Sequence, residues 1–156
     1  MKKIIVALFI MSSLSLAYEM DYTKDTVCEV RQFKVYKEPR WVSKIELQNG
    51  KKVFFSSPKS MFEFYLRPGK WFNVGVKSEK DFKDILVTDY NSLKPIEARA
   101  SFFVYGSRAH SPAGDDLVAF DSYKEATEFA KDYSGKRVFK FREISQALVN
   151  LINGRI

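Results

Sequence analysis

The sequence predicts an α+β fold made of two small β-β-α-β units in tandem, followed by a C-terminal helix. The main observation is an internal repeat: the strand-to-helix segment at residues 53–64 recurs 65 positions later, at residues 118–129. Each copy ends on a phenylalanine, Phe64 or Phe129, which we expect at equivalent core positions. Two further pairs of strand-like segments repeat: residues 33–36 with 102–105, and residues 85–88 with 137–140.

The first unit has clear turn and capping signals. Two alternating segments, residues 42–47 and 51–55, flank an Asn-Gly pair that is typical of a tight β-hairpin. Ser57 then stands where a helix N-cap is expected, and Pro58 occupies the first helical position. One apolar face is predicted for the helix that follows. The other elements expected in this unit are an irregular arm at residues 70–83 and strands at residues 85–90 and 96–105.

The second unit repeats this plan. A strand at residues 117–120 leads to Ser122 and Glu125, which form a capping box ahead of a helix. Gly135 is the expected C-cap of that helix, and a strand follows it. Residues 106–116 should form a long turn-rich loop. The last helix is expected within residues 143–153, with one stripe at helical spacing that packs on the sheet: Ile144, Ala147, Leu148 and Leu151.

The N-terminus has the three parts of a secretory signal peptide at residues 1–17. Two lysines precede an apolar segment, residues 4–16, and Ala17 offers a small residue for cleavage. That segment is shorter than the roughly 20 residues a membrane-spanning helix needs, and Tyr18 is not a lipid-accepting cysteine. The sequence therefore predicts an exported periplasmic protein with no stable membrane anchor.

The predicted domain organisation follows from these signals. Residues 18–32 are polar and have no regular periodicity, so we expect a flexible leader that presents Cys28. The first β-β-α-β unit is expected to span residues 33–98, and the second, with its terminal helix, residues 99–156.

The charge pattern excludes some partners. The formal net charge is +7, and loss of the signal peptide with its two lysines leaves about +5. Basic residues alternate with acidic ones, as in residues 77–81, which is typical of a solvated surface and not of a nucleic-acid-binding stripe. We therefore expect no nucleic acid among the partners.

Enzymatic chemistry has little support in the sequence. The chain contains one cysteine, Cys28, and one histidine, His110, with no nucleophile motif around either of them. Carboxylate pairs such as Asp115 and Asp116 lie in turn-rich segments, where acidic residues are usually solvated. No glycine spacing matches a phosphate-binding loop. The sequence predicts that the protein is not an enzyme.

Metal binding has better support. Thiolate and thioether ligands select copper(I), and imidazole also suits copper. The candidate ligands are Cys28, His110 and, in the leader, Met20. A structural zinc site would need four Cys or His ligands, more than this chain supplies.

Six short stretches spread over the mature chain carry a family resemblance. They are Pro39-Arg40-Trp41, Val53-Phe54-Phe55 with Pro58-Lys59, Val87-Thr88-Asp89-Tyr90, Ile96-Glu97-Ala98-Arg99, Phe103-Val104-Tyr105-Gly106-Ser107 and Gly135-Lys136-Arg137-Val138. In order and spacing, residues 33–154 resemble the NosL family of periplasmic copper-binding accessory proteins of nitrous oxide reductase maturation. The resemblance implies a tandem of two β-β-α-β units, copper(I) as the bound ion, and nitrous oxide reductase or copper-handling proteins as periplasmic clients.

The sequence departs from the family where copper ligands are implied. The resemblance aligns residues 28–33 with the family's Cys-x-x-Cys-Gly-Met motif. Cys28 matches the first cysteine, but Arg31 replaces the second cysteine and Phe33 replaces the methionine. In the Pro-Met-Gly-His motif, Ala113 and Asp115 replace the methionine and the histidine. The family's usual lipid-bearing cysteine is also missing.

Two hypotheses remain open at this point. The first is a NosL-like accessory protein that binds and delivers copper(I) through Cys28, helped by His110. The second is a metal-free binding or assembly module that has kept the scaffold and acts on another periplasmic protein. Either would be a monomer or a weak dimer.

Overall fold

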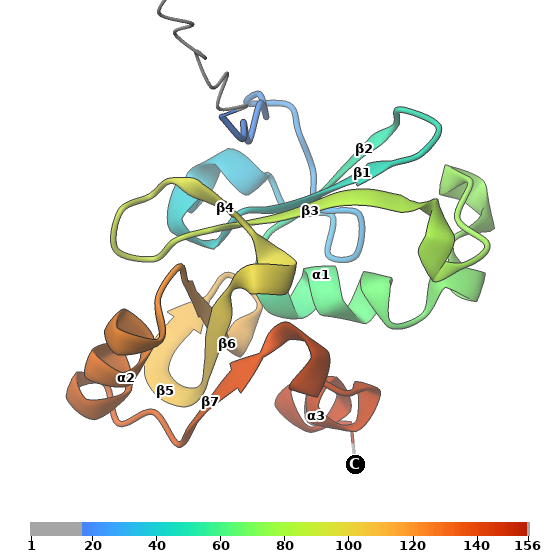
Figure 1. Ribbon diagram of the computed structural model, residues 1–156. Helices are drawn as coiled ribbons and strands as arrows, with labels where there is room; N and C mark the ends of the chain where they lie inside the picture. Colours follow the sequence, from blue (N-terminus) through green and yellow to red (C-terminus); the bar gives the residue numbers. More distant parts are fainter. Residues whose placement is uncertain (1–16, 156) are drawn as a thin grey trace, which may run out of the picture.

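The protein consists of two antiparallel sheets with a helix between them (Figure 1). The computed structural model describes residues 17–155. The helices are α1 (Pro58–Tyr65), α2 (Tyr123–Asp132) and α3 (Gln146–Ile152). The strands are β1 (Ser43–Leu47), β2 (Lys52–Phe55), β3 (Phe82–Thr88), β4 (Pro95–Glu97), β5 (Phe102–Ser111), β6 (Gly114–Phe120) and β7 (Arg137–Lys140).

The two sheets share a three-stranded arrangement, to which the first sheet adds β4. The first sheet has the order β2-β1-β3-β4, and the second has the order β6-β5-β7, with antiparallel neighbours throughout. In each sheet, the strand that follows the helix pairs with the first strand of the hairpin. The predicted α+β class is therefore confirmed. The tandem repeat of two β-β-α-β units, with boundaries at residues 33–98 and 99–156, stays a prediction.

Helix α1 is the centre of the core. Ser57 caps it by accepting a hydrogen bond from the Ser60 N–H, as predicted. All residues of the helix except Tyr65 are buried, so the prediction of a single apolar face was wrong. The helix is enclosed because the second sheet packs on the side that the first sheet leaves free. Phe62, for example, contacts Phe103 of β5 and Phe141, with ring centroids 5.1 and 4.9 Å apart.

The second sheet is covered on both faces. Phe103 faces the main core around α1, whereas Val104 and Phe120 belong to a smaller cluster with Phe129 of α2. Alternation along β5 thus sends neighbouring side chains into two different clusters. Trp41, from a 3-10 helix at Pro39–Trp41, completes the smaller cluster and ties the first unit to the second.

The predicted loop at residues 106–116 is a β-hairpin. β5 continues to Ser111, and β6 starts at Gly114 after a two-residue turn. Gly114 has a φ of 84°, a left-handed conformation that glycine adopts without strain. The strand predicted at residues 96–105 is divided into β4 and β5 by the 3-10 helix Ala98–Ala100.

The N-terminal region also differs from expectation. Residues 33–36 do not form a strand equivalent to part of β5, because Val35–Lys37 is a 3-10 helix. The segment expected to be a flexible leader contacts the first sheet, where Asp21 bonds to the ammonium groups of Lys44 and Lys52. The predicted signal peptide lies outside the described residues except for Ala17.

The C-terminal helix packs differently from the prediction. Its buried residue is Val149, whereas Leu151 is half exposed and Ala147 faces solvent. Two residues of the predicted stripe are in or against the main core, Ile144 just before the helix and Leu148 within it; the other two are not, because α3 packs against α1. Within residues 17–155, no helix has the length and apolar character required to cross a membrane. Further 3-10 helices are Pro68–Lys70, Phe72–Val74, Glu79–Asp81 and Phe141–Glu143.

Candidate functional site

Cys28 lies in a tight turn just before the first sheet. The Cys28 N–H donates to the carbonyl of Phe33, and the Gln32 N–H donates back to the carbonyl of Cys28, both at 2.8 Å. An isolated antiparallel bridge between Val27 and Lys34 closes the base of the turn. Gln32 adopts a φ of 59°, which allows the chain to reverse within so few residues. Below, residues 28–33 are called the Cys28 turn.

The Cys28 thiol is fully buried, with no exposed surface. Its Sγ atom accepts a hydrogen bond from the Arg31 N–H at 3.3 Å. The rest of its surroundings belong to the main apolar core. A soft metal ion binds the thiolate form of cysteine, so this sulfur is the candidate ligand atom of the turn. Met20, the third candidate ligand, is partly buried against the same core.

Arg31 connects the Cys28 turn to a cluster of charged side chains. The sequence resemblance places Arg31 at the family's second cysteine. Its guanidinium donates to Glu63 of α1 at 2.7 Å and to Asn153 Oδ1 at 2.8 Å, and its Nε donates to Ser60 Oγ at 3.4 Å. Arg155 bonds to the other oxygen of Glu63 at 2.9 Å. This position therefore holds a structural ion pair instead of a metal ligand.

Glu63 is almost entirely buried, with 7% of its side chain exposed. Burial acts to raise the pKa of Glu63, but its bond to Arg155 and the charge of Arg31 outweigh burial and lower the pKa. The carboxylate is therefore charged at neutral pH. No sequence pattern indicates this cluster, because its members come from three distant segments: the Cys28 turn, α1 and the residues after α3.

His110 lies near the tip of the β5–β6 hairpin and is well exposed. Its Nδ1 is 3.0 Å from an oxygen of Asp115, and the two residues are directly opposite each other in the strand pairing. Asp115 stands where the sequence resemblance implies a histidine. The imidazole therefore already has a carboxylate partner.

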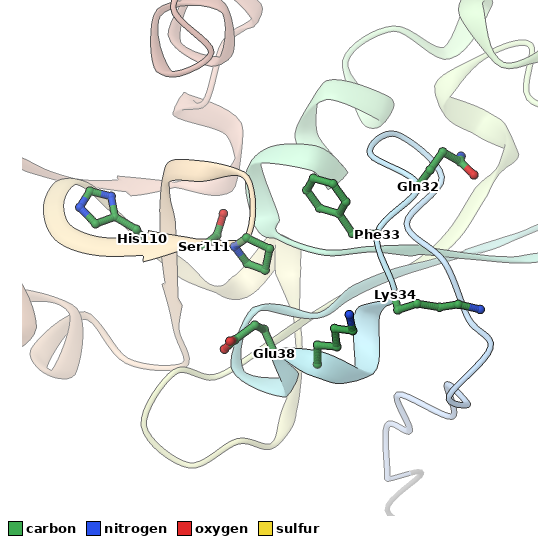
Figure 2. Close-up of a pocket in the computed structure, with 8 residues that line it drawn as sticks. Gln32, Phe33, Lys34, Glu38, His110 and Ser111 are labelled. Carbon is green, nitrogen blue, oxygen red and sulfur yellow. The ribbon is translucent and has the colours of Figure 1, made fainter.

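An open cavity of about 640 Å³ separates the hairpin tip from the segment that follows Cys28. Figure 2 shows Phe33 and Ser111 on facing sides of it, with His110 on the hairpin away from Gln32 and Lys34. The structure thus brings the segments that align with both family motifs to one cavity. The lining residues are Gln32, Phe33, Lys34, Lys37, Glu38, His110, Ser111 and Pro112.

The two predicted metal ligands do not form a preassembled site. His110 lines the cavity, but Cys28 does not. Within residues 17–155, no group of three or more His, Cys, Asp or Glu side chains is arranged to hold a metal ion. The residues present do not fit a closed copper site within one chain.

A buried polar cluster anchors the hairpin tip to α1. Asp116 accepts hydrogen bonds from the Lys59 N–H at 2.7 Å and from Ser111 Oγ at 2.6 Å. The ammonium of Lys59 donates to the carbonyl of Ala113 at 2.8 Å. Burial raises the pKa of Asp116, against the lowering effect of Ser111 and of the Leu117 N–H, and burial also lowers the pKa of Lys59. The sequence prediction had placed Asp116 in a solvated loop and missed this cluster.

Fold and site together define an α+β protein whose two sheets enclose a central helix and whose cavity lies beside a buried thiol. The model of one family, NosL, matches residues 19–149 of this sequence. The chain belongs to the NosL family.

Two solved structures are similar to this fold. The crystal structure of the copper chaperone NosL from Shewanella denitrificans has 23% sequence identity and a TM-score of 0.71, covering 84% of this chain and 98% of that one. The solution structure of apo-NosL from Achromobacter cycloclastes also has 23% identity, with a TM-score of 0.48, covering 69% of this chain and 87% of that one. A comparison with curated proteins gives no match.

Proposed function

We propose that this chain is a periplasmic accessory protein of nitrous oxide reductase maturation that binds and delivers copper(I) through Cys28. The observation that carries the proposal is the Cys28 turn, in which the Arg31 N–H points at the sulfur at 3.3 Å. The thiol stands at the position of the first cysteine of the family motif, as the sequence resemblance implies. Family membership supports the maturation context and a non-enzymatic role.

Copper(I) bound in this way needs further donors from outside the chain. The ion is commonly held by two or three soft ligands, and Cys28 is the one thiol that the sequence provides. The Cys28 turn would also have to open, because the sulfur has no exposed surface. Binding by the isolated monomer should therefore be weak, with the missing donors supplied by a second copy or by the client.

A competition titration tests the proposal. The reduced protein is titrated with copper(I) against a chromophoric chelator, together with Cys28→Ser and His110→Ala. We expect weak binding that disappears in Cys28→Ser and is reduced less in His110→Ala, because the imidazole is already paired with Asp115. Binding that is strong and survives Cys28→Ser would show that the site lies elsewhere.

The ion pair at the second cysteine position favours a second candidate function. Arg31 is bound to a buried carboxylate, and an arrangement of this kind stabilises the fold without any metal. The alternative is a metal-free assembly module that uses the same scaffold to bind a periplasmic client. Absence of copper(I) binding in the same titration, with the fold intact, would favour this module.

A further inference from the structure

We propose that Arg31 and Glu63 form a clasp that keeps the Cys28 turn closed, and that release of this clasp gives a soft metal ion or a partner's thiol access to Cys28. The biological meaning of the clasp rests on the proposed function of Cys28. Its physical basis is independent of copper and lies in the contacts of the turn. Arg31 is thereby a positioning residue and not a ligand.

The turn has few hydrogen bonds to the rest of the molecule; its other attachment is apolar, through buried Cys28 and through Val30, which packs against the main core. Within the described chain, Arg31 provides the side-chain hydrogen bonds that leave the turn, since the amide of Gln32 donates back to Glu29 inside it. The backbone attachments are the bridge at the base of the turn and one bond from the Glu29 N–H to the carbonyl of Phe54. A segment with so few bonds can open locally while both sheets stay folded.

The clasp is strong because its carboxylate is buried and fully paired. Arg31 binds one oxygen of Glu63 at 2.7 Å, and Arg155 binds the other at 2.9 Å. The Asn153 amide donates to the first oxygen at 3.1 Å and accepts from Arg31 at 2.8 Å. Removing one partner of such a cluster leaves a buried charge with fewer compensating groups, which costs more than loss of an exposed pair.

The chain end provides a route to release. Asn153 and Arg155 follow α3, and Arg155 is half exposed. A partner that binds this segment after α3 would remove two of the groups that hold Glu63 and Arg31 in place. Opening of the turn would then be coupled to binding of that partner.

Thiol labelling tests the clasp directly, because Cys28 is the sole cysteine of the chain. The rate of iodoacetamide alkylation is measured by intact mass under native conditions for the wild type, Arg31→Gln and Glu63→Gln. The matched control is Glu46→Gln, which breaks an ion pair of similar length, 2.8 Å, with the half-exposed Lys83 on the first sheet. We expect alkylation about tenfold faster or more in both clasp variants, equivalent to about 1.4 kcal/mol in the opening equilibrium, and less than about twofold faster in the control.

Global stability is measured on the same samples by urea denaturation. If the acceleration were no larger than the increase in the globally unfolded fraction, or if the clasp variants matched the control, the proposal would be overturned. Should Arg31→Gln or Glu63→Gln fail to fold, Arg155→Ala at the half-exposed end of the clasp is the second test, with an expected acceleration of about threefold. An unchanged rate in Arg155→Ala would contradict the proposal.

The two proposals can fail separately. Faster labelling in the clasp variants without any copper(I) binding would support the clasp and refute the copper function. Copper(I) binding that depends on Cys28, with labelling rates unaffected by the clasp variants, would support the copper function and refute the clasp.

Discussion

Replacing Phe64 by alanine should be among the most destabilising changes in this chain. The side chain is fully buried, and its ring lies 4.8 Å from Trp71 and 5.1 Å from Phe55, centroid to centroid. Loss of the buried apolar surface costs about 1.5–3 kcal/mol. The unfilled cavity raises the total to about 3–5 kcal/mol, since Phe55 is held in strand β2 and Trp71 between two 3-10 helices.

Phe129 is the equivalent residue of the predicted repeat. It is 6% exposed, and its ring lies 4.3 Å from Tyr133 and 5.0 Å from Phe120. We expect Phe129→Ala to fall in the same range of about 3–5 kcal/mol. Phe72 is 71% exposed, so Phe72→Ala should change stability by less than about 0.5 kcal/mol and serves as the control.

Urea denaturation followed by far-UV circular dichroism measures all three free energies of unfolding. The equivalence of the two positions requires both core variants to be strongly destabilised relative to Phe72→Ala. If both Phe64→Ala and Phe129→Ala were within experimental error of the wild type, the repeat alignment and the assigned core would be wrong.

Three further predictions concern the N-terminus, the clasp and the β5–β6 hairpin. The exported protein should begin at Tyr18 and carry no lipid, which intact-mass analysis of the periplasmic fraction can check. Retention of residues 1–17, or a lipid adduct, would contradict the predicted export and cleavage. The pKa of Glu63 is lowered in the folded state, so the stability that its charge contributes is complete above the unfolded pKa of about 4.3 and is lost as the pH falls through the folded value. The difference in unfolding free energy between wild type and Glu63→Gln should therefore be large at pH 7 and become smaller below about pH 4. A difference that does not change with pH would rule out this contribution. Asp116→Ala should lower the free energy of unfolding, measured by urea denaturation, by about 2–4 kcal/mol, because it leaves buried donors on Ser111 and Lys59 unpaired. A loss of stability as small as that of a change at an exposed carboxylate would contradict the anchoring role of Asp116.

Local signals in the sequence predicted much of the fold. Ser57 and Ser122 each accept a hydrogen bond from the N–H three residues ahead, as N-caps should. The Asn-Gly pair marks the turn between β1 and β2. These predictions succeeded because capping and tight turns depend on residues that are close in the sequence.

The packing of α1 and most of the site could not be predicted in this way. Lys59 and Glu63 look like the solvent face of an amphipathic helix, yet both are buried. Their partners lie far away in the sequence: the carbonyl of Ala113 for Lys59, and Arg31 and Arg155 for Glu63. Long-range pairings of this kind leave no periodic signal, so neither the clasp nor the hairpin anchor was visible before the structure.

Native mass spectrometry of the copper(I)-loaded protein tests the central claim most directly, namely that Cys28 is a donor that needs a second protein to complete the site. Spectra are recorded for the wild type and for Cys28→Ser over a range of protein concentrations. We predict one copper ion shared by two chains in the wild type, increasing with protein concentration, and no copper adduct in Cys28→Ser. A tight complex of one ion with one chain that persists in Cys28→Ser would contradict the account.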